Sequence, residues 1–301
     1  MKSNVLVLMS SYNGESYIEE QIESILAQEG CNVRLLVRDD GSTDGTRKIL
    51  EKYSTNGKLR YIAGENKGPA RSFLSLVIDS EDADYYAFAD QDDIWDSVKI
   101  IRGIGKLPIS DRPALYCSNL NQINSESIVL QEKILPTEIP TDFAEVATGT
   151  GYLFGCTMVF NKAMKKYIES HGMPEYLIMH DIWLGMIASL FGNLIYDSNS
   201  YIAYRVHNDN FTLLDRKENI FLKLKGAATD SKYSFSKQYE SFANYMELSR
   251  LPKKDSICES MLTYRRKLWD KIRLILYILS KKKLSLKRKI YYCIQIIFNK
   301  F

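Results

Sequence analysis

The sequence predicts an α/β protein built on a mostly parallel sheet with helices on both faces. Short apolar runs alternate with segments whose apolar residues recur every three or four positions, as expected for strands alternating with amphipathic helices. Such alternation favours parallel strands joined by right-handed helical crossovers. A chain of 301 residues with 45% hydrophobic content can also bury a substantial core.

The N-terminal third carries the clearest alternation. The expected strands are Val5 to Ser10, Val33 to Val37, Arg60 to Ala63 and Tyr85 to Ala89. Three helices are expected between these strands. The first contains Ile18, Ile22, Ile25 and Leu26, the second ends at Tyr53, and the third spans Pro69 to Ser80. Their apolar spacing gives each helix one face to lay against the sheet.

The pattern is less regular beyond Ile101. Strands are expected at Ala114 to Leu120, Leu194 to Asp197 and Tyr201 to Arg205, and helices at Asn161 to Ser170 and Met179 to Phe191. A loop with prolines is expected at Ile128 to Phe143, and Gly149 to Phe160 is glycine-rich and apolar. From Lys217 the pattern indicates helices, with a linker at Pro252 to Asp255. This predicts one domain over residues 1–216 and a helical extension over 217–301.

The cysteine pattern argues against a disulfide framework and a zinc site. The five cysteines are Cys31, Cys117, Cys156, Cys258 and Cys293, far apart and without a C-x-x-C pair. A reducing, cytoplasmic setting is therefore expected. The N-terminus lacks the pattern of a signal peptide, and no apolar run is long enough for a membrane-spanning helix.

An acidic motif directly follows the expected strand Tyr85 to Ala89. Asp90, Asp92 and Asp93 stand within four positions in the segment F-A-D-Q-D-D-I-W. Ligands bind at the carboxyl ends of the strands in open α/β sheets, and crowded carboxylates there favour a hard cation such as Mg²⁺ or Mn²⁺. The alternative is a helix start at which Asp92 or Asp93 serves as a solvated cap.

Three loops are expected to line one crevice, because the strands before them end at the same edge of the sheet. These loops are Ser11 to Gly14, Asp39 to Asp44 and Asp90 to Asp93. Acids from different loops suit a nucleotide with a diphosphate, in which one acid accepts hydrogen bonds from the base or ribose and others hold a metal. The alternative for the second loop is a turn that merely leads into a helix.

Five motifs in order give a specific resemblance. They are S-S-Y-N-G-E-S-Y-I-E-E-Q-I, D-D-G-S-T-D-G-T, N-K-G-P-A-R-S-F, F-A-D-Q-D-D-I-W and M-H-D-I-W. Together they resemble glycosyltransferase family 2, whose inverting enzymes have the glycosyltransferase A fold, and in particular its rhamnosyltransferase-like branch of bacterial surface-polysaccharide assembly. The resemblance covers Val5 to about Asn210 and leaves the helical extension unassigned.

The resemblance implies roles for individual residues. It places donor binding on Tyr12, Asn13, Asp39, Asp40, Lys67, Arg71, Asp90, Gln91 and Arg205. It places the metal on Asp92, Asp90 and His207, and the general base on Asp181. It places the acceptor near Gly155, Cys156, Trp183 and His180.

Each of these roles has a structural alternative. Asp181 could be an acid that stabilises a helix N-terminus. His207 could be structural and Lys67 simply solvated, while Gly155 and Trp183 could serve packing.

The activity implied by the resemblance is a metal-dependent, inverting transfer of a sugar, with dTDP-rhamnose as the expected donor. UDP-glucose, UDP-galactose and a UDP-N-acetylhexosamine remain alternative donors. A nucleotidyltransferase and a catalytically silent scaffold are the alternative classes. The first would normally carry a glycine-rich basic loop, and Ser10 to Gly14 is not one.

The C-terminal extension predicts a partner of its own. Basic residues concentrate between Arg265 and Lys300, where Asp270 is the one acid. Two amphipathic helices are expected at Tyr264 to Leu279 and Leu284 to Phe301. They favour an anionic membrane surface, peripheral placement on the cytoplasmic face and a lipid-linked glycan acceptor.

The alternatives for this extension are burial against the first domain and contact with a second subunit in a homodimer. Nucleic acid is not expected as a partner, because no aromatic and basic residues are interleaved beside the basic segment.

Overall fold

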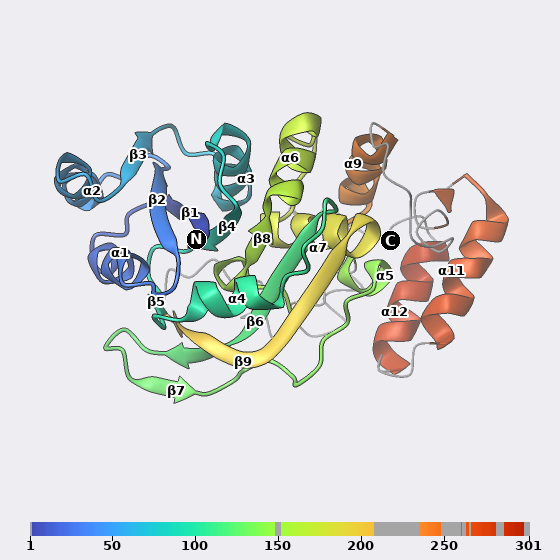
Figure 1. The fold of residues 1–301 in the computed structure, drawn as a ribbon. Coiled ribbons are helices and arrows are strands. Elements are labelled where there is room, and N and C mark those ends of the chain that lie inside the picture. Colours follow the sequence, from blue (N-terminus) through green and yellow to red (C-terminus); the bar gives the residue numbers. More distant parts are fainter. Residues whose placement is uncertain are drawn as a thin grey trace.

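The computed structural model describes residues 2–147, 152–207, 235–247, 260, 263–264, 266–280 and 286–297. One sheet runs through the molecule in the order β3-β2-β1-β4-β8-β6-β9-β5, and β7 pairs with β6 (Figure 1). The strands are β1 Asn4–Ser11, β2 Asn32–Asp39, β3 Arg60–Ala63, β4 Tyr85–Ala89, β5 Ile94–Trp95, β6 Ala114–Ile123, β7 Val129–Gln131, β8 Val159–Asn161 and β9 Asn193–Arg205.

Helices cover both faces of this sheet. They are α1 Ile18–Leu26, α2 Thr46–Thr55, α3 Pro69–Asp79, α4 Lys99–Lys106, α5 Phe143–Ala147, α6 Lys162–His171, α7 His180–Phe191, α9 Phe235–Glu247, α11 Leu268–Ser280 and α12 Leu286–Ile297. A short 3₁₀ helix, η1, spans Gly155–Thr157. The predicted fold class is therefore confirmed.

The strand directions agree with the predicted crossovers. β1, β2, β3 and β4 pair in parallel, and β6 and β9 run in the same direction as these strands. β5, β7 and β8 run against them. The strands expected at residues 194–197 and 201–205 form one long strand, β9, whose register shifts along β6, and β7 lies in the segment expected to be a loop.

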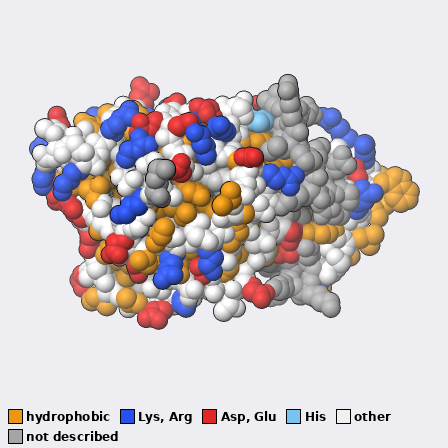
Figure 2. Space-filling view, in the orientation of Figure 1, with side chains coloured by type: hydrophobic (Ala, Val, Ile, Leu, Met, Phe, Trp, Pro, Cys, Tyr) orange, Lys and Arg blue, Asp and Glu red, His pale blue; other side chains and the backbone are white. Residues whose placement is uncertain are grey.

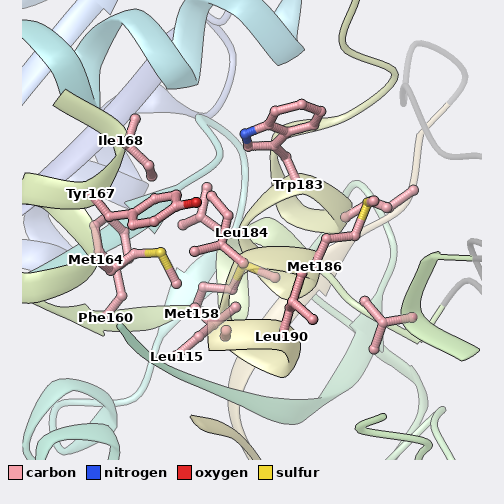
Figure 3. Packing of buried hydrophobic residues seen from close by; sticks show 14 of the residues in the cluster. Leu115, Met158, Phe160, Met164, Tyr167, Ile168, Trp183, Leu184, Met186 and Leu190 are labelled. Atoms are coloured by element: carbon pink, nitrogen blue, oxygen red, sulfur yellow. The ribbon is translucent and has the colours of Figure 1, made fainter. Parts of the chain in front are cut away.

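Alternation along β1 divides the interior into two cores. Leu6 and Leu8 lie in the core that α3, α6 and α7 cover, whereas Val5, Val7 and Met9 lie in the core that α1, α2 and α4 cover. All five are buried, which explains why the strand is a continuous apolar run. Figure 3 shows the first core, where side chains of β8, α6 and α7 interdigitate.

The C-terminal helices join the same core. Leu274 and Ile278 of α11 and Ile296 of α12 are buried in the cluster that contains Trp183 and Phe242. The predicted domain boundary at residue 217, the linker Pro252 to Asp255 and Cys258 lie outside the described residues. Among the helices that the structure describes, none is both long and apolar enough to cross a membrane.

Candidate active site

The loops that follow β1, β2 and β4 meet at one edge of the sheet and bond to one another. The amide of Gln91 bridges to the loop after β1, since its Oε1 accepts from Tyr12 N at 2.8 Å and its Nε2 donates to Tyr12 O at 3.0 Å. Asn13 N donates to Ser42 Oγ at 2.9 Å, and Asn13 Oδ1 accepts from Thr43 N at 2.9 Å. Asn13 adopts φ of 50°, which asparagine tolerates better than most residues. The Tyr12 side chain is 48% exposed beside this junction.

The two acids at the end of β2 are anchored within the protein. Asp39 is fully buried and accepts from Arg47 Nε at 2.6 Å and from Ser42 N. Asp40 accepts from Lys67 N and Gly68 N, both at 2.9 Å, as well as from Arg38. Asp40 therefore bonds the loop at residues 67–68 to the end of β2.

The acids after β4 belong to a cluster in which Asp93 and Cys156 are buried and Asp90 is partly buried. Ligand atoms of Asp90, Asp93 and Cys156 lie within 4.8 Å of one another. Oδ1 of the buried Asp93 accepts from Arg205 N at 3.1 Å, and its Oδ2 has no nitrogen or oxygen donor among the described residues. Burial, followed by repulsion from Asp92, raises the pKa of Asp90 to about 7 and the pKa of Asp93 well above its usual range.

Asp92 lies beside this cluster and faces His207. Asp92 Oδ2 and His207 Nε2 are 2.8 Å apart, close to the roughly 3 Å that separates neighbouring ligands around an octahedral ion of Mg²⁺ size. Of the three predicted metal ligands, Asp92 and His207 are thus brought together, whereas Asp90 groups with Asp93 and Cys156. The carboxylate of Asp92 and the imidazole of His207 suit a hard divalent cation, whereas the Cys156 thiol of the neighbouring group, whose pKa burial raises well above the ordinary value, is a poor ligand for one.

Lys99 lies buried under the acids and was not among the residues predicted from the sequence. Its Nζ sits 3.5 Å from the centroid of the Trp95 ring and has no hydrogen-bond partner among the described residues. Burial lowers its pKa to about 7, against the opposing effect of Cys156, Asp93 and Asp90. No sequence pattern distinguishes this lysine from a solvated one. Asp93 was noted in the motif but was not assigned to the site.

Arg205, which the resemblance assigns to donor binding, lies in a network of hydrogen bonds within the protein. It is buried, its Nε donates to the carbonyl of Asp92 at 2.8 Å, and its Nη2 pairs with Glu20 Oε2 at 2.6 Å. Its guanidinium also stacks 4.5 Å from the Tyr17 ring centroid. Nη1 donates to Asn124 O, Ser125 O and Ser127 Oγ. The guanidinium is thus engaged within the protein, and a contact with a donor diphosphate would require giving up these bonds.

We expect Arg205→Lys to destabilise the fold by about 3 kcal/mol, because one ammonium cannot replace the forked guanidinium and leaves Glu20 and several carbonyls without donors. Chemical denaturation measures this change. Arg102→Lys, at an exposed arginine of α4, is the matched control and should change stability little. A loss below about 1 kcal/mol would show that the network is dispensable.

Asp181 stands in the first turn of α7 and close to the acidic cluster. It is 9% exposed, and its Oδ1 accepts from Ile182 N at 2.6 Å. Burial raises its pKa to about 7, while the backbone N–H groups of Ile182 and Gly155 favour the carboxylate. The charge of Asp181 also raises the pKa of Asp90. A carboxyl group with this pKa can take up and release a proton at neutral pH.

The residues predicted to contact the acceptor lie mostly in packed surroundings. The His180 ring stacks on Phe73 at 4.1 Å and meets Phe88 edge-on at 4.9 Å, and burial lowers its pKa to about 3. A Cβ on Gly155 would come within 2.4 Å of His180 Nε2, so glycine permits this close packing. Trp183 is fully buried. The packing alternative therefore describes His180, Gly155 and Trp183 better than exposure to an acceptor.

Lys67 and Arg71 line a cavity of about 390 Å³ on the outer side of α3. Its other lining residues are Ser75, Ile78, Asp79, Gly172 and Met173. Arg71 donates to Glu175 O at 2.9 Å. The residues that line this cavity include none of the acids after β4, so the structure does not bring these two basic side chains into the acidic cluster.

The nine-stranded sheet, the acids at the ends of β2 and β4 and the family model together define the class of protein, a glycosyltransferase with the glycosyltransferase A fold. The chain matches the model of glycosyl transferase family 2 over residues 6–167, and it belongs to that family. This agrees with the resemblance seen in the sequence motifs and disfavours a nucleotidyltransferase.

Known relatives support this assignment. The chain is 31% identical over 219 residues to dTDP-rhamnosyl transferase RfbG of Shigella flexneri, which covers 67% of this chain and 72% of the relative. It is 33% identical over 216 residues to the putative teichuronic acid biosynthesis glycosyltransferase TuaG of Bacillus subtilis, covering 70% and 82%. The mannosyltransferase PcManGT of Pyrobaculum calidifontis, solved with GDP-Man and Mn²⁺, shares the fold with a TM-score of 0.53 at 13% identity, covering 99% of this chain and 85% of that one.

Proposed function

We propose that this glycosyltransferase moves L-rhamnose from dTDP-rhamnose, with inversion, onto a lipid-linked acceptor in the synthesis of a bacterial surface polysaccharide. The observation that carries the proposal is the set of acids that directly follows β4, with Asp181 of α7 near enough for its charge to act on Asp90. The similarity to RfbG and TuaG supports the donor and the pathway class. A lipid-linked acceptor lies in the membrane, so we also propose that the enzyme is peripheral on the cytoplasmic face of that membrane.

Asp181 is the proposed general base. In an inverting transfer the acceptor hydroxyl attacks the sugar on the face opposite the departing nucleotide, so a base must take its proton there. The backbone N–H of Ile182 donates to Asp181 Oδ1 at 2.6 Å and helps to orient the carboxylate. Because the carboxyl group has a pKa of about 7, it is ionised in a large fraction of molecules at neutral pH and is basic enough to accept the proton.

Asp92 and His207, together with Asp90 of the same loop, are the residues that would hold Mg²⁺ or Mn²⁺. Such an ion would neutralise the charge of the departing diphosphate. The family and the Mn²⁺ in the PcManGT structure support a divalent cation, without selecting between the two ions. Tyr12, Asn13 and Asp39 are the proposed contacts of the base and ribose. Asp39 is buried and bonded to Arg47 Nε, so its carboxylate would have to be uncovered to reach the ligand.

Calorimetric titration of the full chain tests the donor. We expect dTDP-rhamnose to bind with Mn²⁺ and to lose most of its affinity when EDTA replaces the ion. UDP-glucose, UDP-galactose and UDP-N-acetylglucosamine serve as competitors in the same panel, and donor saturation should stabilise the fold by about 3 kcal/mol at a hundredfold excess over Kd. Binding of a UDP-sugar in preference to dTDP-rhamnose would reject the rhamnose assignment, and equal binding in EDTA would reject the metal requirement.

A further inference from the structure

We propose that the helix pair α11 and α12 has two apolar faces. The inner face packs against the catalytic domain, and the outer face inserts into an anionic lipid leaflet. This deepens the proposed function and rests on its lipid-linked acceptor. The sequence left burial and membrane contact as alternatives for these helices. In the structure, some side chains of these helices are buried against the domain, and other side chains of the same helices are exposed and available for a membrane.

The inner face attaches the helices to the body of the protein. Leu274 and Ile278 of α11 are 1% exposed and belong to the core that also contains Trp183, as does Ile296 of α12. The Tyr277 hydroxyl donates to Asp142 Oδ1 at 2.5 Å, across a separation of 135 residues in the chain. These contacts fix the orientation of α11 relative to the sheet.

The outer face of α11 is a stripe of exposed apolar side chains. Trp269 is 79% exposed, Leu268 71% and Leu276 61%, and Ile272 and Leu279 continue the stripe at helical spacing. α12 adds the exposed Leu286, Ile290 and Ile297. Figure 2 shows hydrophobic side chains at the end of the molecule that carries these helices, with lysines and arginines close to them. A contiguous exposed apolar surface with an aromatic residue is typical of a contact with lipid or protein.

The charge around this stripe selects the partner. Arg266 and Lys267 are exposed next to it, and Arg273, also exposed, pairs with Asp270 at 3.6 Å. Asp270, the one acid of the sequence from residue 266 to 301, is buried and accepts from Ser260 Oγ at 3.1 Å and Thr263 Oγ1 at 2.6 Å. The outer face therefore presents apolar and cationic groups together, which matches the hydrocarbon boundary and the anionic head groups of a leaflet.

A second copy of the chain fits this surface less well. A twofold contact places the same patch on both sides of the interface, so the arginines and lysines would face their own copies. The sequence adds Lys281 to Lys283 and Lys287 to Lys289 at the same end of the chain. Repulsion between like charges disfavours that pairing, whereas anionic lipid neutralises the same groups.

Vesicle co-sedimentation of the full chain tests the proposal. The wild-type chain is expected to sediment with phosphatidylcholine vesicles that contain phosphatidylglycerol and to remain in solution with phosphatidylcholine alone. Trp269→Ser combined with Leu276→Ser removes two exposed side chains and should lower the partition coefficient at least about tenfold. Ile109→Ser is the matched control, because Ile109 is fully exposed elsewhere on the surface and should bind as wild type.

Failure of this inference can be separated from failure of the proposed function. If the double variant binds anionic vesicles as well as wild type, or if wild type does not bind them, the lipid contact is wrong. A second outcome would show that the face joins two copies instead. In that case the wild type is a dimer by analytical ultracentrifugation, and the double variant is a monomer that binds vesicles to the same extent as the wild type. Donor titration of the double variant should match wild type, because the crevice is unchanged, and it reports on the transfer proposal alone.

Discussion

Replacing Asp181 by Asn is expected to lower kcat by about 10³-fold, while the donor still binds. The amide keeps the size of the carboxyl group but cannot take the proton from the acceptor hydroxyl, and general-base catalysis contributes about 10²–10⁴-fold. Wild-type kcat/KM should also fall as the pH drops below about 7, since protonation of Asp181 removes the base. Asp111→Asn, at an exposed acid of a surface loop, is the control. A variant that transfers sugar at the normal rate would exclude Asp181 as the base.

The same substitution should raise stability at alkaline pH. Because burial raises the pKa of Asp181 from 3.8 to about 7, the folded state binds its proton more tightly than the unfolded state does. Ionisation of the buried carboxyl therefore destabilises the wild type as pH rises through that range, by about 1.4 kcal/mol per pKa unit. The melting temperature of Asp181→Asn should thus be higher than that of the wild type at pH 8, and the difference should be much smaller at pH 4. An equal difference at both pH values would mean that the effect has another origin.

Asp92→Asn is expected to weaken Mn²⁺-dependent donor binding by about 10²-fold or more, because it removes a charged oxygen from the predicted ion site. The amide can still meet His207, so the fold should survive and the melting temperature without metal should stay close to that of wild type. Calorimetric titration of dTDP-rhamnose with and without Mn²⁺ measures the change.

Asp93→Asn discriminates between two places for the ion. Asp93 is fully buried and bonds to Arg205 N, whereas Asp92 faces His207 at the mouth of the cluster. If Asp93→Asn removes the metal dependence and Asp92→Asn leaves it intact, the ion belongs with Asp90, Asp93 and Cys156. The Asp92 assignment would then be wrong.

The sequence predicted best what depends on local pattern. Each of β1 to β4 is a short run that ends at a polar loop, and parallel pairing of such strands brings their loops to one edge regardless of side-chain detail. The convergence of Tyr12, Thr43 and Gln91 follows from that topology.

Contacts between distant segments could not be predicted in this way. The partners of Arg205 come from α1, from the loop after β6 and from the loop after β4, and no spacing in the sequence links these segments. Likewise, the periodicity of α11 shows that its residues are apolar but not which of them meet the catalytic domain. Trp269 and Leu274 are both apolar and have opposite surroundings.

The hydrogen bonds among the crevice loops bear on how a donor is selected. Gln91 joins the first and third loops, and Asn13 joins the first to the second, before any nucleotide arrives. The entropy of ordering these backbones is lost when the chain folds and not again when a donor binds. Differences in affinity between nucleotide sugars should therefore reflect direct contacts with the base and the sugar, and the crevice acts as a rigid template.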